Sequence, residues 1–262
     1  MNAIIVSDLH IGSRYFQSGM FERFLEELPA DHGLIMNGDI IDAPHGQMAK
    51  SDQSVLDRIE KISHQRQMVW IRGNHENGYV PQNFGQVVFK RQYSIGNRLL
   101  ITHGDDFDDI MPRSRLFIKA FKLMHNLRVK LGGKPMHVAE YAKKWKSFYR
   151  VLRNHVALNA VKCAAENGYR AVTCGHTHYP EEVAFNGIRY INTGAWTEFP
   201  AYYLHITPDA MTLKQVDPSF VMQRAQSAHS DQMDSALPSR KASHCPANAG
   251  PDLSKIAPGE PR

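Results

Sequence analysis

Five short apolar runs recur between residues 3 and 174, and each is followed at once by a cluster of polar residues. Runs this short, and apolar throughout, suit buried strands better than helices. Between them, Phe16–Leu28 and Gln53–Gln67 have the apolar spacing of helices, and Pro29 ends the first. Strands that alternate with helices predict an α/β fold built in layers. The runs are Ala3–Val6, Leu34–Met36, Met68–Ile71, Leu99–Thr102 and Ala171–Cys174.

Two further pairs of runs have the pattern of β-hairpins. Gln86–Tyr93 is expected to pair with Arg98–Thr102, and Ile188–Ile191 with Tyr202–Ile206. Hairpins add antiparallel strands, so we expect a mixed sheet or a sandwich of two sheets instead of one parallel sheet.

Each polar cluster at a strand end contains side chains of the types that ligate metals. Because ligands in α/β sheets bind beyond the carboxyl ends of strands, the five loops are expected to converge on one site. Imidazole and carboxylate without thiolate suit Mn, Fe or Zn. Even the seven of these side chains that we expect to be ligands are too many for one ion and right for two ions that share a carboxylate. The clusters are Asp8-Leu9-His10, Gly38-Asp39-Ile40-Ile41-Asp42, Gly73-Asn74-His75-Glu76, His103-Gly104-Asp105 and Gly175-His176-Thr177-His178.

A pair of metal ions has a defined use in phosphate chemistry. Two cations about 3.5–4 Å apart hold a hydroxide between them and clamp both oxygens of an in-line displacement at phosphorus. The glycines before Asp39, Asn74 and His176 are expected to let the backbone turn sharply and to bring these side chains close to the ions. The residues themselves therefore predict metal-dependent hydrolysis of a phosphate ester or anhydride.

The formal net charge of +5 is unevenly distributed along the chain. Residues 113–153 contain twelve basic side chains and a single acidic one, Glu140, so this segment carries +11 and the rest of the chain −6. A segment so basic is expected to attract an anionic substrate or an anionic membrane surface. We predict that the substrate-binding residues are Arg113, Arg115, Lys143, Lys144 and Lys146.

The same basic segment has helical patterns. Arg115–Leu131 carries apolar residues at helical spacing, and Gly132-Gly133-Lys134-Pro135 breaks it. A second helical pattern runs from about His137 to Asn167, with Gly168 at a C-cap position. A helical hairpin inserted between two strands explains both patterns.

Three segments follow from these patterns. Residues 1–111 and 168–218 are expected to form the core, and residues 112–167 the basic helical insertion. Residues 219–262 are rich in Gln, Ser, Ala and Pro and poor in large apolar residues, and we predict that this tail is disordered.

The five polar clusters together resemble the signature blocks of the calcineurin-like metallophosphoesterases, over roughly residues 1–207. That resemblance implies a four-layer α/β/β/α sandwich and two divalent metal ions, with Mn favoured and Fe or Zn also compatible. Asp39 would bridge the two ions and take part in catalysis. His75 matches the position that protonates the leaving oxygen or steadies the transition state, and Asp42 would orient a ligand histidine or its loop. One ion would bind Asp8, His10, Asp39 and His178, and the other Asp39, Asn74, His103 and His176.

A narrower similarity joins His103–Asp108, the basic insertion and Tyr190–Glu198. Together they are similar to the UDP-2,3-diacylglucosamine diphosphatase group of lipid A synthesis, whose helical insertion is a lid over the acylated sugar at the inner face of the membrane. The resemblance implies a nucleotide-sugar lipid substrate and peripheral membrane contact through the insertion, whose basic and apolar side chains suit a diphosphate and acyl chains. His75 stands where that group usually has Arg, which leaves a sister branch with another substrate open.

Other functions remain open on the sequence. The same site would serve a nucleotide or phosphoprotein phosphatase. The basic insertion would also suit a nucleic-acid-binding protein or a nuclease, but its aromatic residues have helical spacing instead of forming a strand platform, so nucleic acid is not the expected partner. A non-catalytic scaffold is disfavoured by the complete ligand set.

The rest of the composition bears on location. Cys163, Cys174 and Cys245 are too few and too scattered for a disulfide framework or a thiolate zinc site. No stretch approaches the roughly 20 apolar residues of a membrane span, and the first residues do not have the pattern of a signal peptide. We expect a reducing, cytoplasmic location.

Overall fold

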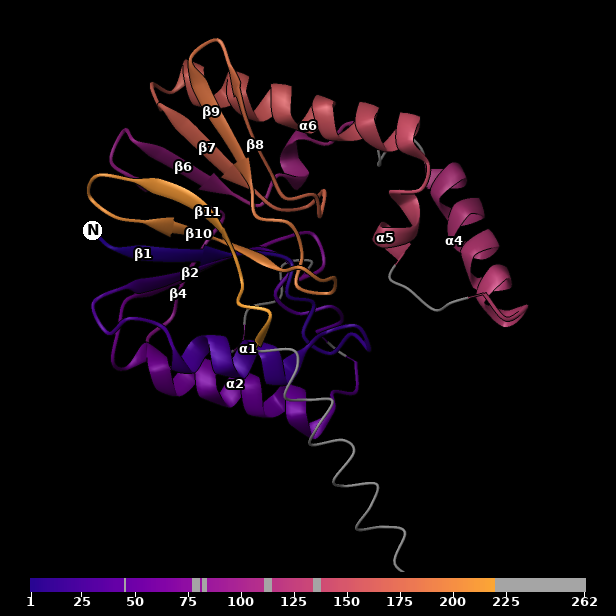
Figure 1. The fold of residues 1–262 in the computed structure, drawn as a ribbon, viewed down its shortest axis with the longest axis horizontal. Coiled ribbons are helices and arrows are strands. Elements are labelled where there is room, and N and C mark those ends of the chain that lie inside the picture. The colour runs from indigo at the N-terminus through magenta and orange to yellow at the C-terminus, as the bar shows by residue number, and fades with distance from the viewer. Residues whose placement is uncertain (45, 77–80, 82–83, 111–114, 134–137, 220–262) are drawn as a thin grey trace, which may run out of the picture. The chain divides into compact units, whose positions relative to one another are not determined.

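The computed structural model describes residues 1–44, 46–76, 81, 84–110, 115–133 and 138–219, and Figure 1 shows the arrangement of their elements. Two mixed β-sheets form the centre of this part of the chain. The first contains, in spatial order, β11 (Met211–Gln215), β10 (Tyr202–Ile206), β1 (Ala3–Val6), β2 (Gly33–Asn37), β3 (Met68–Ile71) and β4 (Val88–Lys90). The second contains β5 (Gln92–Ile95), β6 (Leu99–Thr102), β7 (Ala171–Cys174), β9 (Ile188–Asn192) and β8 (Glu181–Phe185).

Each sheet has a parallel centre. β1, β2, β3 and β4 are parallel, and β10 and β11 extend the sheet by antiparallel pairing. β6, β7 and β9 are parallel, with antiparallel β5 and β8 at the two edges. The five predicted strand runs all lie in these two parallel sets, which confirms the prediction of buried strands.

Alternation along the central strands separates the layers. Ile4 and Val6 of β1 pack with α1 (Ser18–Glu26) and α2 (Lys50–Ser63), whereas Ala3 and Ile5 face the second sheet. Because successive side chains of a strand point to opposite faces, one fully apolar strand fills both cores.

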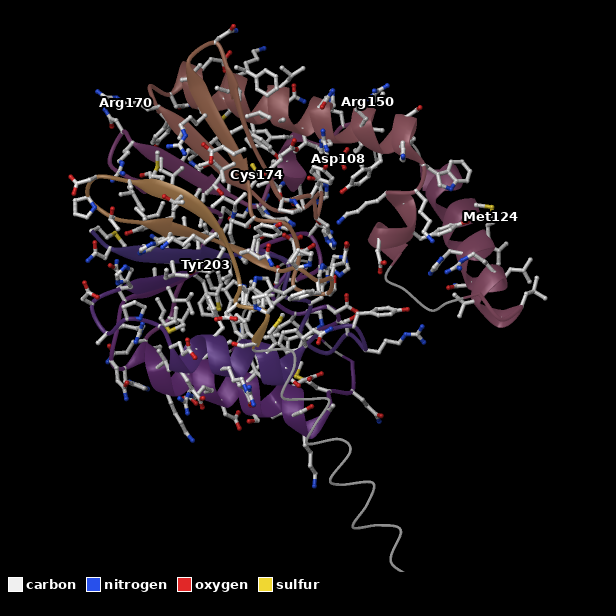
Figure 2. All side chains as sticks on the ribbon, viewed as in Figure 1. Asp108, Met124, Arg150, Arg170, Cys174 and Tyr203 are labelled. Carbon is white, nitrogen blue, oxygen red and sulfur yellow. The ribbon has the colours of Figure 1, made fainter. Side chains whose placement is uncertain are left out.

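The second sheet is covered in the same way on its outer face. Leu100 and Val172 pack against Ala157, Ala160 and Ala164 of α6 (Lys146–Glu166). Cys174, labelled in Figure 2, is fully buried in the same cluster. Helices, two sheets and a further helix therefore form four layers, and the α/β/β/α fold is confirmed (Figure 1).

The first predicted hairpin is only half right. β5 does pair with β6, but the run Gln86–Tyr93 is divided at Arg91, and β4 joins the first sheet beside β3. The ring of Phe89 packs on Trp70, with 5.4 Å between centroids, and this contact holds β4 in the first sheet. One apolar run therefore serves both sheets.

The second predicted hairpin is wrong. β9 pairs with β7 and β8, whereas β10 pairs with β1 and β11 in the other sheet. Trp196 lies in the connection, fully buried between Phe21 and Phe24 of α1, each 4.9 Å away between ring centroids. Burial of Trp196 in the first core therefore fixes the connection between β9 in the second sheet and β10 in the first.

The predicted helical segment contains three helices in the described residues. α4 (Arg115–Lys130) agrees with the first pattern. The second is not one helix, because α5 (Val138–Ala142) ends before Lys143 and α6 begins at Lys146. Gly168 adopts a φ of 73° after α6, as its C-cap position predicts.

The remaining expectations about organisation fall partly outside the description. Residues 111–114, 134–137 and 220–262 are not described, and the predicted disordered tail belongs to them except for Ser219. Among the helices that the structure does describe, none combines the length and the apolar character needed to cross a bilayer.

Candidate metal centre

The predicted ligands lie in loops that follow the carboxyl ends of strands. The loops after β1, β2 and β3 come from the first sheet, and those after β6 and β7 come from the second. Parallel strands place such loops at one edge of a sheet. In chain order, these loops present Asp8, His10, Asp39, Asn74, His103, His176 and His178.

The backbone of these loops is strained where the ligands lie. Among the described residues, six that are not glycine have a positive φ, and only Asn186 of these is not a predicted ligand. Left-handed backbone is uncommon for such residues and persists where the surroundings enforce it, often at functional sites. The five strained ligands, with φ between 51° and 61°, are Asp8, His10, Asp39, His176 and His178.

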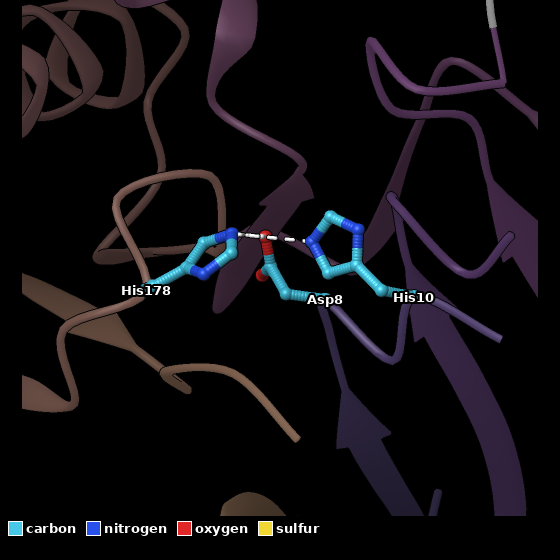
Figure 3. Close-up of side chains that lie close together, drawn as sticks. All are labelled: Asp8, His10 and His178. Carbon is cyan, nitrogen blue, oxygen red and sulfur yellow. Dashed lines mark hydrogen bonds and ion pairs between the residues drawn. The ribbon is translucent and has the colours of Figure 1, made fainter. Parts of the chain in front are cut away.

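Asp8, His10 and His178 form the first cluster, shown in Figure 3. Nε2 of His178 lies 3.2 Å from Oδ1 of Asp8 and 3.2 Å from Nε2 of His10. Nδ1 of His10 lies 3.0 Å from Oδ1 of Asp42. Asp42 therefore contacts a predicted ligand histidine, and its role in orienting that ligand stays a prediction.

Asp8, Asp39 and His103 form a second cluster beside the first. Nδ1 of His103 lies 3.1 Å from the carbonyl oxygen of Asn37, so its N–H donates to the backbone and Nε2 faces the site. That Nε2 lies 3.3 Å from Oδ2 of Asp39. Each carboxylate of the centre thus faces an imidazole nitrogen.

His176 and Asn74 complete the second cluster. Nδ1 of His176 lies 3.0 Å from Oδ1 of Asn74, and its backbone N–H donates to both carboxylate oxygens of Asp8 at 3.1 and 3.2 Å. The structure therefore brings all seven predicted ligands into one region. Their assignment to particular ions stays a prediction.

Burial and neighbouring charges shift the pKa values of the buried ligands in opposite directions. Burial raises the pKa of Asp39, but the adjacent imidazoles, His103 foremost, hold it well below its ordinary value. Burial also raises the pKa of Asp8, and its contacts with His178 outweigh this effect and lower it. Burial lowers the pKa of His103, whereas Asp39 raises it, and the net change is well above the ordinary value. Two buried carboxylates therefore remain ionised, which suits a site for cations.

The donor set fits the divalent ions that the family resemblance implies. Nε2 of His103 is buried and faces Oδ2 of Asp39 at 3.3 Å, so an imidazole nitrogen and a carboxylate oxygen both point into the centre. Three imidazoles and two carboxylates, without a thiolate, provide the ligand types that Mn, Fe and Zn accept. The buried clusters are compatible with a dinuclear site.

Glycines allow this close packing, as the sequence predicted. A Cβ at Gly73 would lie 2.3 Å from Oδ1 of Asp39, and one at Gly175 would lie 2.1 Å from Oδ2 of Asp8. A Cβ at Gly38 would meet His103 at 2.3 Å. No other residue fits these positions without displacing a predicted ligand.

Glu76 has a role that the sequence reasoning did not assign. Its buried carboxylate accepts hydrogen bonds from the backbone N–H groups of Gly73, Asp39, Ile40 and Ile41, at 2.6, 3.2, 2.5 and 3.2 Å. One side chain thereby joins the loops after β2 and β3. Its place three residues after Gly73 in the same cluster was the available signal.

His75, the predicted proton donor, lies at the more open side of the centre, with 37% of its side chain exposed. Its Nδ1 lies 3.0 Å from the carbonyl oxygen and 3.3 Å from Oδ1 of Asp42, and its backbone N–H donates to Asp39 at 2.8 Å. Burial lowers the pKa of His75, but Asp42 and Asp39 raise it to about 9.

The predicted substrate-binding residues have different surroundings. Arg113 lies outside the described residues, and Arg115 begins α4 with a side chain outside the description. Lys144 and Lys146 are exposed. Nζ of Lys143 instead donates to the carbonyl oxygen of His178 at 2.5 Å and to Oε2 of Glu198 at 2.7 Å. Substrate contact stays a prediction for all five.

Comparison with solved structures gives distant likenesses. The Escherichia coli phosphoesterase Yfce is 15% identical with a TM-score of 0.42, over 83% of this chain and 100% of that chain. The Pseudomonas putida nuclease MPE is 17% identical with a TM-score of 0.40, over 81% and 87%. An archaeal phosphodiesterase is 13% identical with a TM-score of 0.42, over 82% and 99%. At these scores the likenesses carry no argument about activity.

The family follows from a comparison of the sequence with family models. No curated protein matches this chain. A family model described as calcineurin-like phosphoesterase matches residues 1–180, well over half of the chain and all five ligand loops. The chain therefore belongs to the calcineurin-like phosphoesterase family and is a metal-dependent phosphohydrolase.

Proposed function

We propose that this protein hydrolyses the diphosphate of a nucleotide-sugar lipid of the UDP-2,3-diacylglucosamine type. The observation that carries the proposal is an exposed apolar strip on and just after α4. Leu123, Leu127 and Leu131 follow at intervals of four residues, and their side chains are 71%, 54% and 79% exposed. Residues four apart share one face of a helix, so the three form a continuous apolar surface suited to acyl chains.

Exposed basic residues of the same helical segment suit the other half of such a substrate. Lys130 is exposed at the end of α4, Lys144 is exposed between α5 and α6, and Lys146 is exposed at the start of α6. Exposed ammonium groups and an apolar strip in the same helical segment suit a diphosphate that is attached to acyl chains. The same combination favours peripheral contact with an anionic membrane surface.

The chain's own residues supply the remaining chemistry. Asp8, His10, Asp39, His103 and His178 are among the residues that would hold two divalent cations, which would supply Lewis-acid activation of water and charge neutralisation at phosphorus. Asp42 and Asp39 raise the pKa of His75 to about 9, which favours the protonated form that a proton donor needs, and 37% of its side chain is exposed. Asp42 fixes the ring through Nδ1, which directs Nε2 away from Asp42.

The test compares substrates and not only variants. Protein loaded with Mn²⁺ is assayed with UDP-2,3-diacylglucosamine, a bis-nucleotide, a phosphopeptide and single-stranded DNA. We expect the nucleotide-sugar lipid to have the highest kcat/KM. Leu127→Gln should raise KM for this substrate and leave hydrolysis of the small diester bis(4-nitrophenyl) phosphate unchanged.

Other outcomes have definite meanings. Preference for the bis-nucleotide or the phosphopeptide would replace the proposal by a nucleotide or phosphoprotein phosphatase. Cleavage of DNA in preference to the lipid would indicate a nuclease.

A further inference from the structure

Two consecutive carbonyl groups of the metal-ligand loop after β7 are bound from the helical segment. The hydroxyl of Tyr149 donates to the carbonyl oxygen of Thr177, and Nζ of Lys143 donates to that of His178 at 2.5 Å. His178 is also the residue whose Nε2 meets Asp8 and His10. The backbone of a predicted ligand is therefore held by residues far from it in the sequence.

Lys143 is itself held in place. Its ammonium pairs with Oε2 of Glu198 at 2.7 Å, and the two side chains are only 21% and 17% exposed. It therefore links three segments: the connection between α5 and α6, the loop after β7, and the loop that contains Glu198. An ammonium engaged in two short contacts of this kind has less freedom to reach a substrate.

Tyr149 belongs to a second group of contacts along the same loop. It is 6% exposed, and its ring lies 6.1 Å from that of Tyr179 between centroids. The guanidinium of Arg153 covers Tyr179 at 4.1 Å, and its Nε lies 3.1 Å from Oε1 of Glu181. Contacts from the start of α6 therefore continue along the chain from Thr177 to Glu181.

The two ends of the ligand loop are held differently. Gly175 is held by the second sheet and the loop after β6. Its N–H donates to the backbone carbonyl oxygen of His103 at 2.9 Å, and its own carbonyl oxygen accepts from Nδ2 of Asn192 at 2.6 Å. At the other end, Nδ2 of Asn192 also donates to Oγ1 of Thr177 at 3.1 Å, and the carbonyls of Thr177 and His178 are bound in addition by Tyr149 and Lys143. The position of His178 thus depends on the helical segment as well as on the core.

We propose that Lys143 and Tyr149 are positioning residues that hold His178 in the geometry needed for metal binding, so that attachment of the α5–α6 segment sets the metal affinity of the centre. This inference rests on the metal centre of the proposed function and is independent of the lipid substrate. It gives Lys143 a different role from the substrate contact that the sequence predicted.

The test measures metal binding directly in the full chain. Lys143→Met and Tyr149→Phe remove the two donors and keep most of each side chain. Arg150→Met is the matched control, because Arg150 follows Tyr149 in the sequence and is exposed on α6, where Figure 2 labels it. Binding of Mn²⁺ to chelator-treated protein is measured by calorimetry, and hydrolysis of bis(4-nitrophenyl) phosphate is followed as a function of the Mn²⁺ concentration.

We expect Lys143→Met and Tyr149→Phe each to bind Mn²⁺ about tenfold or more weakly than the wild type. Substitution of residues that support metal ligands commonly lowers metal affinity by this much. Activity should recover when Mn²⁺ is in excess, and Arg150→Met should match the wild type. Unchanged Mn²⁺ affinity in both variants would overturn the proposal. A raised KM for substrate with unchanged Mn²⁺ affinity in Lys143→Met would do the same and would restore Lys143 as a substrate residue.

Two further controls keep the outcomes distinct. Lys143→Met leaves Glu198 without its ammonium, so the double variant Lys143→Met/Glu198→Gln separates the lost contact to His178 from an unpaired carboxylate. It should bind Mn²⁺ as weakly as Lys143→Met, and wild-type affinity in it would count against the proposal. Failure to hydrolyse UDP-2,3-diacylglucosamine would remove the proposed substrate and leave the Mn²⁺ result intact.

Discussion

Asp108 and His176 form a carboxylate–imidazole pair, with 2.9 Å between Oδ2 and Nε2 and only 2% of the Asp108 side chain exposed. A carboxylate at Nε2 favours the tautomer with the proton there, which leaves a lone pair on Nδ1. That nitrogen faces Oδ1 of Asn74 at 3.0 Å. With that tautomer, Nδ1 of His176 and Oδ1 of Asn74 would both be able to ligate a cation.

This pair predicts a role for Asp108 in metal binding. Asp108→Asn removes the charge that fixes the tautomer of His176, so the affinity for Mn²⁺ should fall by about 10- to 100-fold. Asp109→Asn is the control, since Asp109 is 56% exposed and faces His155 at 3.7 Å. Calorimetry with Mn²⁺ checks both variants, and equal affinities for Asp108→Asn and the wild type would contradict this role.

Glu76 is predicted to stabilise the fold through the two loops that it joins. In Glu76→Gln the amide group would face backbone N–H donors that the carboxylate now satisfies. We expect the free energy of unfolding of the metal-free protein to fall by about 1–3 kcal/mol. Urea denaturation measures the change, with Glu182→Gln as control because Glu182 is 41% exposed. An equal effect of the two substitutions would show that Glu76 has no special role.

The sequence allowed the local features of the fold to be predicted, because each depends on neighbouring residues. Strand β1 and the ligands Asp8 and His10 lie within one short segment, so the apolar run and its polar end are visible together. The same holds for the glycine beside Asp39, whose small size is required by His103. The local sequence pattern was therefore sufficient to predict a strand together with the ligands in the loop that directly follows it.

Long-range partners could not be predicted in this way. β9 and β10 follow each other in the chain and lie in different sheets, because Trp196 is buried in the first core. Lys143 has the pattern of a basic surface residue, and its partners lie 35 and 55 residues away. Such contacts depend on how the layers pack against one another in the folded protein. Neither the periodicity nor the composition of the sequence contains that information.

Metal binding is predicted to stabilise the protein as well as to activate it. Five buried ligand side chains converge in the two clusters, so a bound ion interacts with the folded chain and much less with the unfolded one. At a free Mn²⁺ concentration 100 times the Kd, the gain in stability is about 2.7 kcal/mol. Thermal unfolding with and without Mn²⁺ measures it, and the midpoint should rise with concentration.

Substitution of a ligand separates this effect from general ionic stabilisation. Asp39→Asn should abolish turnover and most of the Mn²⁺-dependent rise in Tm, while the metal-free protein stays folded. Activity of the chelator-treated wild type should be lost and should return on addition of Mn²⁺. Full activity in the metal-stripped protein would contradict the assignment of a metal-dependent hydrolase.

A histidine pair away from the metal centre predicts a dependence of stability on pH. Nε2 of His205 in β10 lies 2.9 Å from Nε2 of His32, and Nδ1 of His32 lies 2.8 Å from Oδ1 of Asp31. Burial, then Lys214 and His32, lower the pKa of His205, and Asp31 opposes them. His205 is therefore neutral in the folded chain at a pH where the unfolded chain already protonates it.

The sign of the effect follows from proton linkage. Below the ordinary histidine pKa of 6.5 the unfolded state binds more protons at this position, so His205 contributes stability above that pH and loses it as the pH falls. The free energy of unfolding of the wild type should therefore decrease more between pH 7.5 and 5.5 than that of His205→Gln. Urea denaturation in the presence of a chelator measures both, with the exposed His64→Gln as control. If His205→Gln and the wild type lose equal stability over this range, the proton balance at His205 does not differ between the folded and unfolded states.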